Sequence, residues 1–166
     1  MITQEELKNN LCYCPFSGEF KWNIEKQGVY IGKIAGHERK CNDISYIMIN
    51  VNDKTYLAHR LAFLYMKGYL PKEIDHIDGD GTNNKWNNLR DVPHSINMKN
   101  QKRSKNNKSG ITGVSWHKKS SKWISKIVVD GEYKYLGTFS NIEDAIKARK
   151  EAEIKYKFHK NHDRVA

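Results

Sequence analysis

The central stretch of this chain reads Glu73-Ile-Asp-His-Ile-Asp-Gly-Asp-Gly-Thr-Asn-Asn-Lys-Trp-Asn-Asn-Leu-Arg-Asp-Val92. Its first segment, residues 73–77, is short, partly apolar and bounded by polar residues, as a β-strand often is. Residues 78–88 are nearly all polar and include two glycines, which predicts a long loop. Residues 89–92 suit a second short strand, and Pro93 is well placed as the first residue of a helix through Met98. The stretch therefore predicts a strand, a long loop, a strand and a helix.

Asp75 and His76 are the residues of this stretch that point to chemistry. Hydrolysis of a DNA phosphodiester needs a base near neutral pH for the attacking water, and a cation to neutralise charge on the phosphate and the departing 3′ oxygen. Histidine suits the first task because its unperturbed pKa is about 6.5, and aspartate supplies a hard oxygen ligand for Mg²⁺ or Mn²⁺. Neighbours on a strand point to opposite faces, so both residues can serve one site only if the strand end bends into the loop.

Three motifs in this region resemble the HNH endonucleases that phages and mobile introns carry. They are Asp75-His76-Ile-Asp-Gly-Asp80, Asn87-Asn88-Leu-Arg90 and His94-Ser-Ile-Asn97, and the steps of 12 and 9 residues between His76, Asn88 and Asn97 match the family pattern. The resemblance implies a ββα-metal (His-Me) finger in which His76 is the general base and Asn88 holds the loop. It also implies one divalent metal ion with Asp75 and Asn97 as its protein ligands. Asn97 stands where the family name expects a final histidine, and an oxygen-only pair favours Mg²⁺ or Mn²⁺ over Zn²⁺.

Several nearby residues have two interpretations each. His94 lies three residues before Asn97, so it can touch the metal or a phosphate, or be a polar residue at a helix start. Arg90 can contact phosphate or brace the loop. His59, in a segment that also resembles the family, can pack against the finger or take part in catalysis. The loop itself is not an EF-hand, because counting from Asp78 puts asparagine at the sixth position and leucine at the twelfth.

The C-terminal stretch carries a second pattern. Residues 113–117, 122–129 and 132–136 read as three strands, and Asp130-Gly131 is a strong hairpin turn between the last two. Asn141 is placed to cap a helix whose apolar side repeats alanine. This stretch therefore predicts a three-stranded antiparallel sheet with one helix across it.

From Ser109 to Tyr156 the chain resembles the DNA-binding domain of plant ethylene-response factors. The resemblance rests on Gly113-Val114, Lys122-Trp123, Leu136-Gly-Thr-Phe139 and the alanine-spaced helix, and it implies a sheet that lies in the major groove of duplex DNA. Strand alternation then sorts the side chains into two faces. Those expected to face the helix are Val114, Trp116, Trp123, Ser125, Ile127 and Leu136. Those expected to face DNA are Ser115, His117, Ile124, Lys126, Val128, Tyr133 and Tyr135, with Lys118, Lys119 and Lys122 near the backbone.

Charge separates the same two regions. The formal net charge is +10, and all of it lies between Lys99 and Ala166, with 17 Lys and Arg against 7 Asp and Glu; residues 1–98 carry 12 of each. Such asymmetry indicates a polyanionic partner for the C-terminal region. The run 99–109 has no apolar residue and reads as a helix end followed by a basic tether, which can also contact phosphate.

These observations predict an α+β chain with four parts. Residues 1–56 form a β-rich segment that packs on the nuclease, 57–103 the nuclease core, 104–109 a basic linker and 110–160 the DNA-binding domain. In the N-terminal part, residues 18–22, 31–34 and 46–51 read as strands, and 58–67 as a helix closed by Gly68.

The expected function is that of a homing-type, metal-dependent DNA endonuclease that acts on duplex DNA as a monomer. The acidic, polar N-terminus and the absence of an apolar run of about 20 residues suggest an intracellular protein with no membrane partner, in the cytoplasm of a bacterial or phage-infected cell. Two alternatives stay open: a DNA-binding regulator with a vestigial nuclease centre, and an RNA-binding module. Cys12-Tyr-Cys14 with Cys41 can supply zinc ligands, but the spacing more often means free thiols.

Overall fold

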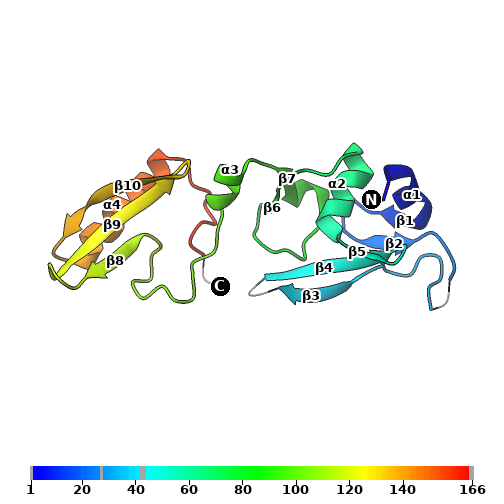
Figure 1. The fold of residues 1–166 in the computed structure, drawn as a ribbon, viewed down its shortest axis with the longest axis horizontal. Coiled ribbons are helices and arrows are strands. Elements are labelled where there is room, and N and C mark those ends of the chain that lie inside the picture. Colours follow the sequence, from blue (N-terminus) through cyan, green and yellow to red (C-terminus); the bar gives the residue numbers. More distant parts are fainter. Residues whose placement is uncertain (1, 27, 42–43, 165–166) are drawn as a thin grey trace. The chain divides into compact units, whose positions relative to one another are not determined.

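The computed structural model describes residues 2–26, 28–41 and 44–164. The chain divides into two compact units, the first ending at Val92 and the second beginning at Pro93 (Figure 1). The division falls inside the segment 57–103 that the sequence groups as one core. Each unit is described by itself below.

The first unit begins with a short helix and a β-hairpin. Helix α1 (Gln4–Asn10) starts in a capping box in which Thr3 accepts from the Glu6 amide and Glu6 accepts from the Thr3 amide. Strands β1 (Leu11–Tyr13) and β2 (Phe20–Trp22) pair antiparallel, with Leu11 opposite Trp22. The sequence analysis predicted neither the helix nor β1.

A three-stranded antiparallel sheet and a helix follow. The sheet runs in the order β3 (His37–Cys41), β4 (Ile44–Val51) and β5 (Lys54–Leu57). Asn52 and Asp53 turn the chain between β4 and β5, both with positive φ, as a two-residue hairpin turn requires. Helix α2 (Ala58–Lys67) ends at Gly68, whose φ of 76° is left-handed, so the predicted helix and its glycine stop are confirmed.

The last part of the first unit is a two-stranded ribbon. Strand β6 (Ile74–His76) pairs antiparallel with β7 (Leu89–Asp91), and the short 3₁₀ helix η1 (Trp86–Asn88) leads into β7. The sequence prediction of a strand, a long polar loop and a strand is confirmed here.

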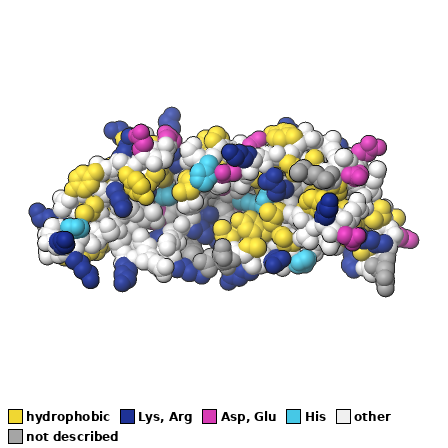
Figure 2. All heavy atoms as spheres, viewed as in Figure 1, with side chains coloured by type: hydrophobic (Ala, Val, Ile, Leu, Met, Phe, Trp, Pro, Cys, Tyr) yellow, Lys and Arg dark blue, Asp and Glu magenta, His cyan; other side chains and the backbone are white. Residues whose placement is uncertain are grey.

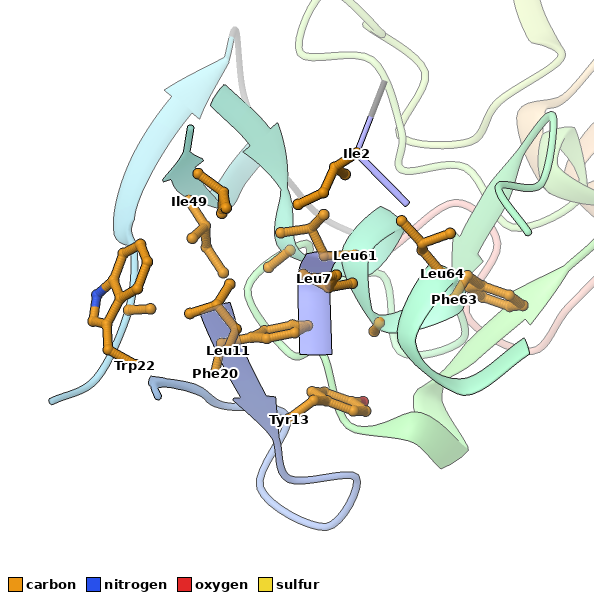
Figure 3. Close-up of a cluster of buried hydrophobic side chains, with 14 of the residues drawn as sticks. Ile2, Leu7, Leu11, Tyr13, Phe20, Trp22, Ile49, Leu61, Phe63 and Leu64 are labelled. Carbon is orange, nitrogen blue, oxygen red and sulfur yellow. The ribbon is translucent and has the colours of Figure 1, made fainter. Parts of the chain in front are cut away.

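One hydrophobic core holds the first unit together. Leu7, Leu11, Phe20, Ile49 and Leu61 are all less than 2% exposed, so α1, β1, β2, β4 and α2 all contribute to it. Figure 3 shows these side chains pointing toward one another, with Tyr13, Trp22, Phe63 and Leu64 around them. Leu89 of β7 belongs to the same core. The N-terminal 56 residues therefore share their core with the strands that carry Asp75 and His76.

The second unit is a sheet covered by a helix. It begins with the short helix α3 (His94–Met98) and continues with β8 (Val114–His117), β9 (Lys122–Val129) and β10 (Glu132–Phe139), which pair antiparallel in the order β10-β9-β8. Asp130 and Gly131 both have positive φ in the hairpin turn, as predicted. Helix α4 (Ile142–Lys155) follows, with the Asn141 side chain accepting from the Asp144 amide.

Helix α4 lies against β9 and β10 (Figure 1). Ile127, Val129 and Ala152 form a buried cluster, with Leu136, Tyr156 and Phe158 packed beside it. A buried ion pair adds to this contact: Arg149 donates to Glu153 at 2.9 Å and to the backbone carbonyl of Lys126 at 2.8 Å. The antiparallel three-stranded sheet with one helix is thus confirmed as an arrangement.

Three sequence predictions need correction. Residues 31–34 do not form a strand: Ile34 makes only an isolated bridge to Lys21, because Gly32 turns the chain with a φ of 86°. Trp116 is 46% exposed and is not covered by the helix. Pro93 is the N-cap of α3 and not its first helical residue.

Two expected features can also be compared with the structure. The three cysteines are exposed free thiols. Among the helices of the described ranges, none combines the length and apolar character needed to span a bilayer.

Candidate functional site

Strand β6 places two polar residues side by side in the interior of the first unit. Asp75 is 6% exposed and His76 is 7% exposed. Asp75 lies opposite Arg90 and His76 lies opposite Leu89 on β7. His76 is the last residue of the strand, and the chain turns directly afterwards, where the Gly79 amide donates to the His76 carbonyl at 2.8 Å. Buried polar residues at the end of a two-stranded ribbon call for an explanation by their partners.

Asp75 forms an ion pair with Arg90. Nε of Arg90 donates a hydrogen bond to Oδ2 of Asp75 at 2.8 Å, and Nη2 lies 2.6 Å from the same oxygen in the ion pair. The Arg90 side chain is 29% exposed and that of Asp75 is 7% exposed, so the pair lies at the edge of the interior. Arg90 therefore compensates the charge of a buried carboxylate and holds it in place. This geometry favours the bracing interpretation of Arg90 over phosphate contact.

His76 has a ring suited to accepting a proton. Burial lowers its pKa, while a hydrogen bond to Asn84 and the charges of Asp78, Asp75 and Asp80 act in the opposite direction. The net result is a pKa below the ordinary value of 6.5, so the imidazole is neutral at pH 7. A neutral histidine in a dry site is the protonation state that a general base needs.

Two aromatic rings pack against His76. The ring of His59, from α2, meets it edge to face with centroids 5.0 Å apart and planes at 89°. Tyr46, from β4, lies 6.3 Å from His76 and 5.6 Å from His59 between ring centroids. Burial, followed by the charges of His76 and Arg60, lowers the pKa of His59 to about 3. His59 is thus a neutral packing residue, which favours the first of its two interpretations.

Asn88 closes the loop between β6 and β7. Its Oδ1 accepts from the Asp78 amide at 3.0 Å, and its Nδ2 donates to Oδ1 of Asp78 at 2.9 Å and to the Asn83 carbonyl at 2.8 Å. Burial raises the pKa of Asp78, but hydrogen bonds from Asp80, Asn88 and Asn83 outweigh it and lower the pKa overall. The side chain of Asn88 therefore ties both ends of the loop together.

Asn84, which the sequence analysis did not single out, is the most buried polar residue of this loop. It is 2% exposed, and its Oδ1 lies 3.3 Å from Nε2 of His76. Its backbone carbonyl accepts from the hydroxyl of Tyr13 at 2.6 Å. No sequence signal distinguishes Asn84 from the adjacent Asn83, because only the fold reveals which asparagine points inward.

His94 and Asn97 lie on α3 and belong to the second unit. They are three residues apart on one short helix, which places them on the same side. The first unit thus brings together Asp75, His76, Asn88 and Arg90, while the pairing of Asp75 with Asn97 stays a prediction.

The donor set of the first unit fits a hard cation in part. Asp75 offers carboxylate oxygens at the end of β6, which is the ligand type that Mg²⁺ and Mn²⁺ prefer. Among the described residues, no group of three His, Cys, Asp or Glu side chains could hold a metal ion. A cation at Asp75 would therefore depend on few protein ligands and on oxygens of a bound phosphate, as is usual for Mg²⁺.

The outer face of the second unit's sheet carries the residues predicted to face DNA. Cross-strand pairs place Ser115 beside Ile124, His117 beside Lys122, Lys126 beside Tyr135 and Val128 beside Tyr133. Ser125, Ile127 and Val129 alternate with these and are buried. Tyr133 and Tyr135 are 76% and 66% exposed. The face opposite α4 is therefore open and combines aromatic with basic side chains.

Basic side chains surround this face. The Nζ of Lys126 lies 5.4 Å from the ring centre of Tyr133. Lys118 and Lys119 are exposed in the connection between β8 and β9. In Figure 2 several lysine and arginine side chains project from the surface that β8 and β9 form. Apart from Trp116, the register and burial agree with the sequence-based sorting of the two faces.

Two comparisons relate part of this chain to known proteins. Residues 56–99 match the family model of the HNH endonucleases. Over 66 residues the chain is 39% identical to Protein 3.8 of Escherichia phage T7. The matched segment covers 40% of this chain and 52% of that protein. The chain thus spans about half the length of this curated relative. No solved structure matches the chain.

The family match covers the elements that form the site described above. It includes α2, β6, the loop, β7 and α3, and therefore His59, Asp75, His76, Asn88 and Asn97. It ends at residue 99. The resemblance of the C-terminal stretch to ethylene-response factors is not supported by these comparisons, so the DNA-binding role of that sheet is a proposal.

Proposed function

We propose that this chain is a metal-dependent endonuclease that hydrolyses phosphodiester bonds of duplex DNA. The observation that carries the proposal is the buried, neutral imidazole of His76 directly beside the carboxylate of Asp75, within the segment that matches the HNH endonucleases. A base and a hard oxygen ligand on adjacent residues are the two groups that metal-assisted hydrolysis requires.

Each residue of the site has a defined task in this proposal. His76 accepts the proton of the attacking water. Asp75, with Asn97 from α3, would hold one Mg²⁺ or Mn²⁺ ion, which neutralises charge on the phosphate and the departing oxygen when bound. Arg90 fixes the carboxylate of Asp75 through a hydrogen bond and an ion pair. Asn88 keeps the loop closed beside His76.

The second unit is proposed to hold the DNA. Its outer sheet face presents Ser115, His117, Lys122, Lys126, Tyr133 and Tyr135, with Lys118 and Lys119 beside it. A two- or three-stranded sheet fits the major groove, where tyrosine and lysine can contact bases and phosphates. His94 and the basic run after α3 would add contacts to the backbone. The excess positive charge of this region, +10, supports a polyanionic partner.

Few arginines lie on this face, so we expect a loose sequence preference. Arginine makes the bidentate contacts to guanine that give strong discrimination, and lysine makes them less well. This fits a site-preferring enzyme of the homing type that acts as a monomer and cuts one strand at each visit.

The experiment that tests the proposal is cleavage of supercoiled plasmid and phage DNA. Wild-type protein and His76→Ala are incubated with Mg²⁺, with Mn²⁺ or with EDTA, and duplex binding is measured in parallel. We expect nicked or linear DNA only from the wild type with metal, and equal DNA binding by both proteins. If neither protein cuts any DNA with any metal while both bind duplex tightly, the chain is a DNA-binding regulator and the proposal is wrong.

A further inference from the structure

Asn84 meets His76 through an amide whose orientation is fixed. Its Oδ1 lies 3.3 Å from Nε2 of His76, and its Nδ2 donates to the carbonyl of Thr82 at 3.0 Å. A carbonyl oxygen only accepts hydrogen bonds, so the group next to Thr82 must be the NH₂ end of the amide. The oxygen end therefore faces the imidazole. Asn84 is 2% exposed, so water does not compete for this contact.

The orientation of the amide decides which ring nitrogen of His76 carries hydrogen. An amide oxygen has no hydrogen to give, so Nε2 of His76 must be the donor. In a neutral imidazole the other nitrogen then holds the lone pair. We propose that Asn84 is a positioning residue that selects the Nε2–H tautomer of His76 and so makes Nδ1 the nitrogen that acts as the base.

This inference rests on the proposed role of His76 as general base. In that step the proton of water passes to Nδ1 and the water oxygen bonds to phosphorus. The bond between phosphorus and the 3′ oxygen breaks, and that oxygen takes a proton from solvent. The wrong tautomer would present an N–H to the water and could not accept its proton.

The N-terminal hairpin holds Asn84 in position. The Tyr13 hydroxyl donates to the Asn84 carbonyl at 2.6 Å, and the Trp86 amide donates to the Pro15 carbonyl at 2.9 Å. A Cβ on Gly18 would lie only 2.5 Å from the carbonyl carbon of Asn84, so the hairpin touches the loop backbone directly. Strands β1 and β2 and their connection therefore brace the residue that orients the base.

The ring contacts of His76 orient the imidazole but do not select its tautomer. His59 lies edge to face with it and Tyr46 is tilted against it. Such contacts fix the plane of the imidazole but do not distinguish one tautomer from the other, because the two have the same shape. Selection of the tautomer is thus assigned to the hydrogen bond with Asn84.

The test measures the tautomer directly in the full chain. Long-range ¹H–¹⁵N NMR of the histidine rings distinguishes a protonated ring nitrogen from a bare one, and the His76 signals are identified by their loss in His76→Ala. The variants are Asn84→Leu, which keeps the size but cannot accept, and Asn84→Asp, which restores an acceptor. Asn83→Leu is the matched control, because its side chain bonds to Asp78 and the Lys85 amide and not to His76.

We expect Nε2–H in the wild type, in Asn84→Asp and in Asn83→Leu, and loss of that preference in Asn84→Leu. Cleavage by Asn84→Leu should fall about 10- to 100-fold in kcat, the range seen when a partner that orients an active-site ligand is removed, with KM little changed. A wild-type ring protonated at Nδ1, or a tautomer unaltered in a folded Asn84→Leu, would overturn the inference. Because the NMR result does not need turnover, an inactive wild type would count against the proposed function alone.

Discussion

Arg90 forms an ion pair with the buried carboxylate of Asp75. Its Nε donates a hydrogen bond to Oδ2, Nη2 lies 2.6 Å from the same oxygen, and the Asp75 side chain is 7% exposed. Loss of one partner of a buried ion pair costs up to about 3 to 5 kcal/mol. We expect Arg90→Met to lower the free energy of unfolding by up to this amount in EDTA, measured by urea denaturation.

The metal and a second arginine provide the controls for this prediction. If Asp75 is a metal ligand, Mg²⁺ or Mn²⁺ should recover part of the stability of Arg90→Met, because a cation can replace the guanidinium. Arg39→Met, on the exposed strand β3, should change stability by less than about 0.5 kcal/mol. Equal stability of Arg90→Met and wild type in EDTA would show that the ion pair contributes nothing.

His59 makes the stability of the first unit depend on pH. Its pKa in the folded state is about 3, below the ordinary value of 6.5, so protons bind the unfolded state in preference. The stabilising contribution is therefore complete above pH 6.5 and is lost as the pH falls toward 3. Linkage gives a loss of about 2 kcal/mol between pH 7.5 and pH 5.

The variant His59→Phe keeps a ring in the same place but cannot take a proton. Urea denaturation of both proteins at pH 7.5 and pH 5, in EDTA, should show the wild type losing about 2 kcal/mol more than the variant. His76 titrates in both proteins, so its contribution largely cancels in the comparison. An identical loss in the two proteins would mean that His59 is accessible to protons in the folded state.

At the scale of elements, the contact between the β1–β2 hairpin and the loop between β6 and β7 can be tested at Gly18. Its φ is +80°, and an added Cβ would lie 2.5 Å from backbone atoms of Asn84 and Lys85. Gly32 also has a positive φ, +86°, but an added Cβ there meets nothing within 4 Å. Both variants to alanine carry similar backbone strain, of about 1 kcal/mol, but only Gly18→Ala pushes the hairpin away from the loop.

We expect Gly18→Ala to be destabilised by roughly 1 to 3 kcal/mol more than Gly32→Ala in thermal unfolding. It should also lose plasmid cleavage at a temperature where it is still folded, because Asn84 moves with the loop backbone. Equal stability and equal cleavage of the two variants would show that the close approach of hairpin and loop has no consequence.

The salt dependence of DNA affinity can show whether DNA binds the outer sheet face or the helix face of the second unit. Lys126 lies on the open face beside Tyr133 and Tyr135, whereas Lys147 is exposed on α4, which covers the opposite face. Each phosphate contact contributes about 0.9 to the slope of log affinity against log salt. Lys126→Gln should therefore lower this slope by about 1, and Lys147→Gln, with the same change of charge, should leave it unaltered. A larger effect of Lys147→Gln would place the DNA on the helix side.

The elements that the sequence predicted best are those with strong local signals. Helix α2 has an amphipathic pattern and a glycine stop, and the β9–β10 hairpin has Asp130-Gly131 between alternating strands. Helix α1 is only seven residues long and β1 only three, so periodicity cannot reveal them, although Thr3 and Glu6 form a capping box. Residues 31–34 begin and end with the β-branched isoleucines typical of a strand, but Gly32 turns the chain instead.

The residues of the candidate site divide in the same way, into those that local sequence signals predict and those that only the fold reveals. Asp75 and His76 follow from the chemistry of metal-assisted hydrolysis, and Asn88 follows from the spacing of the motifs that resemble the HNH endonucleases. Asn84 could not be found from the sequence, because its position depends on long-range contacts. Its backbone carbonyl accepts a hydrogen bond from Tyr13, which lies 71 residues away in the chain. Arg90 had two interpretations from the sequence, phosphate contact or bracing of the loop, and its cross-strand position opposite Asp75 favours a bracing role.

At the scale of the whole molecule, the candidate catalytic residues and the excess positive charge lie in different regions of the chain. The first unit contains Asp75 and His76 within a core built from α1 to β7, and residues 1–98 have no net charge. The positive excess lies in residues 99–166. Because the N-terminal strands share one core with the β6–β7 ribbon, removal of residues 1–56 should unfold the first unit rather than merely weaken DNA binding.

This separation predicts that binding and cutting respond to different conditions. If about six phosphates are neutralised, duplex affinity should fall roughly a thousandfold between 50 and 200 mM salt, in EDTA as well as in Mg²⁺. His76→Ala should show the same slope, because a neutral imidazole releases no counterion from DNA. Fluorescence anisotropy with a labelled duplex measures both slopes. A shallow slope of log affinity against log salt for the wild type would show that the second unit does not bind the DNA phosphates as proposed. A slope that falls by about 1 in His76→Ala would mean that the ring is charged on DNA, and then it could not be the base that takes a proton from water.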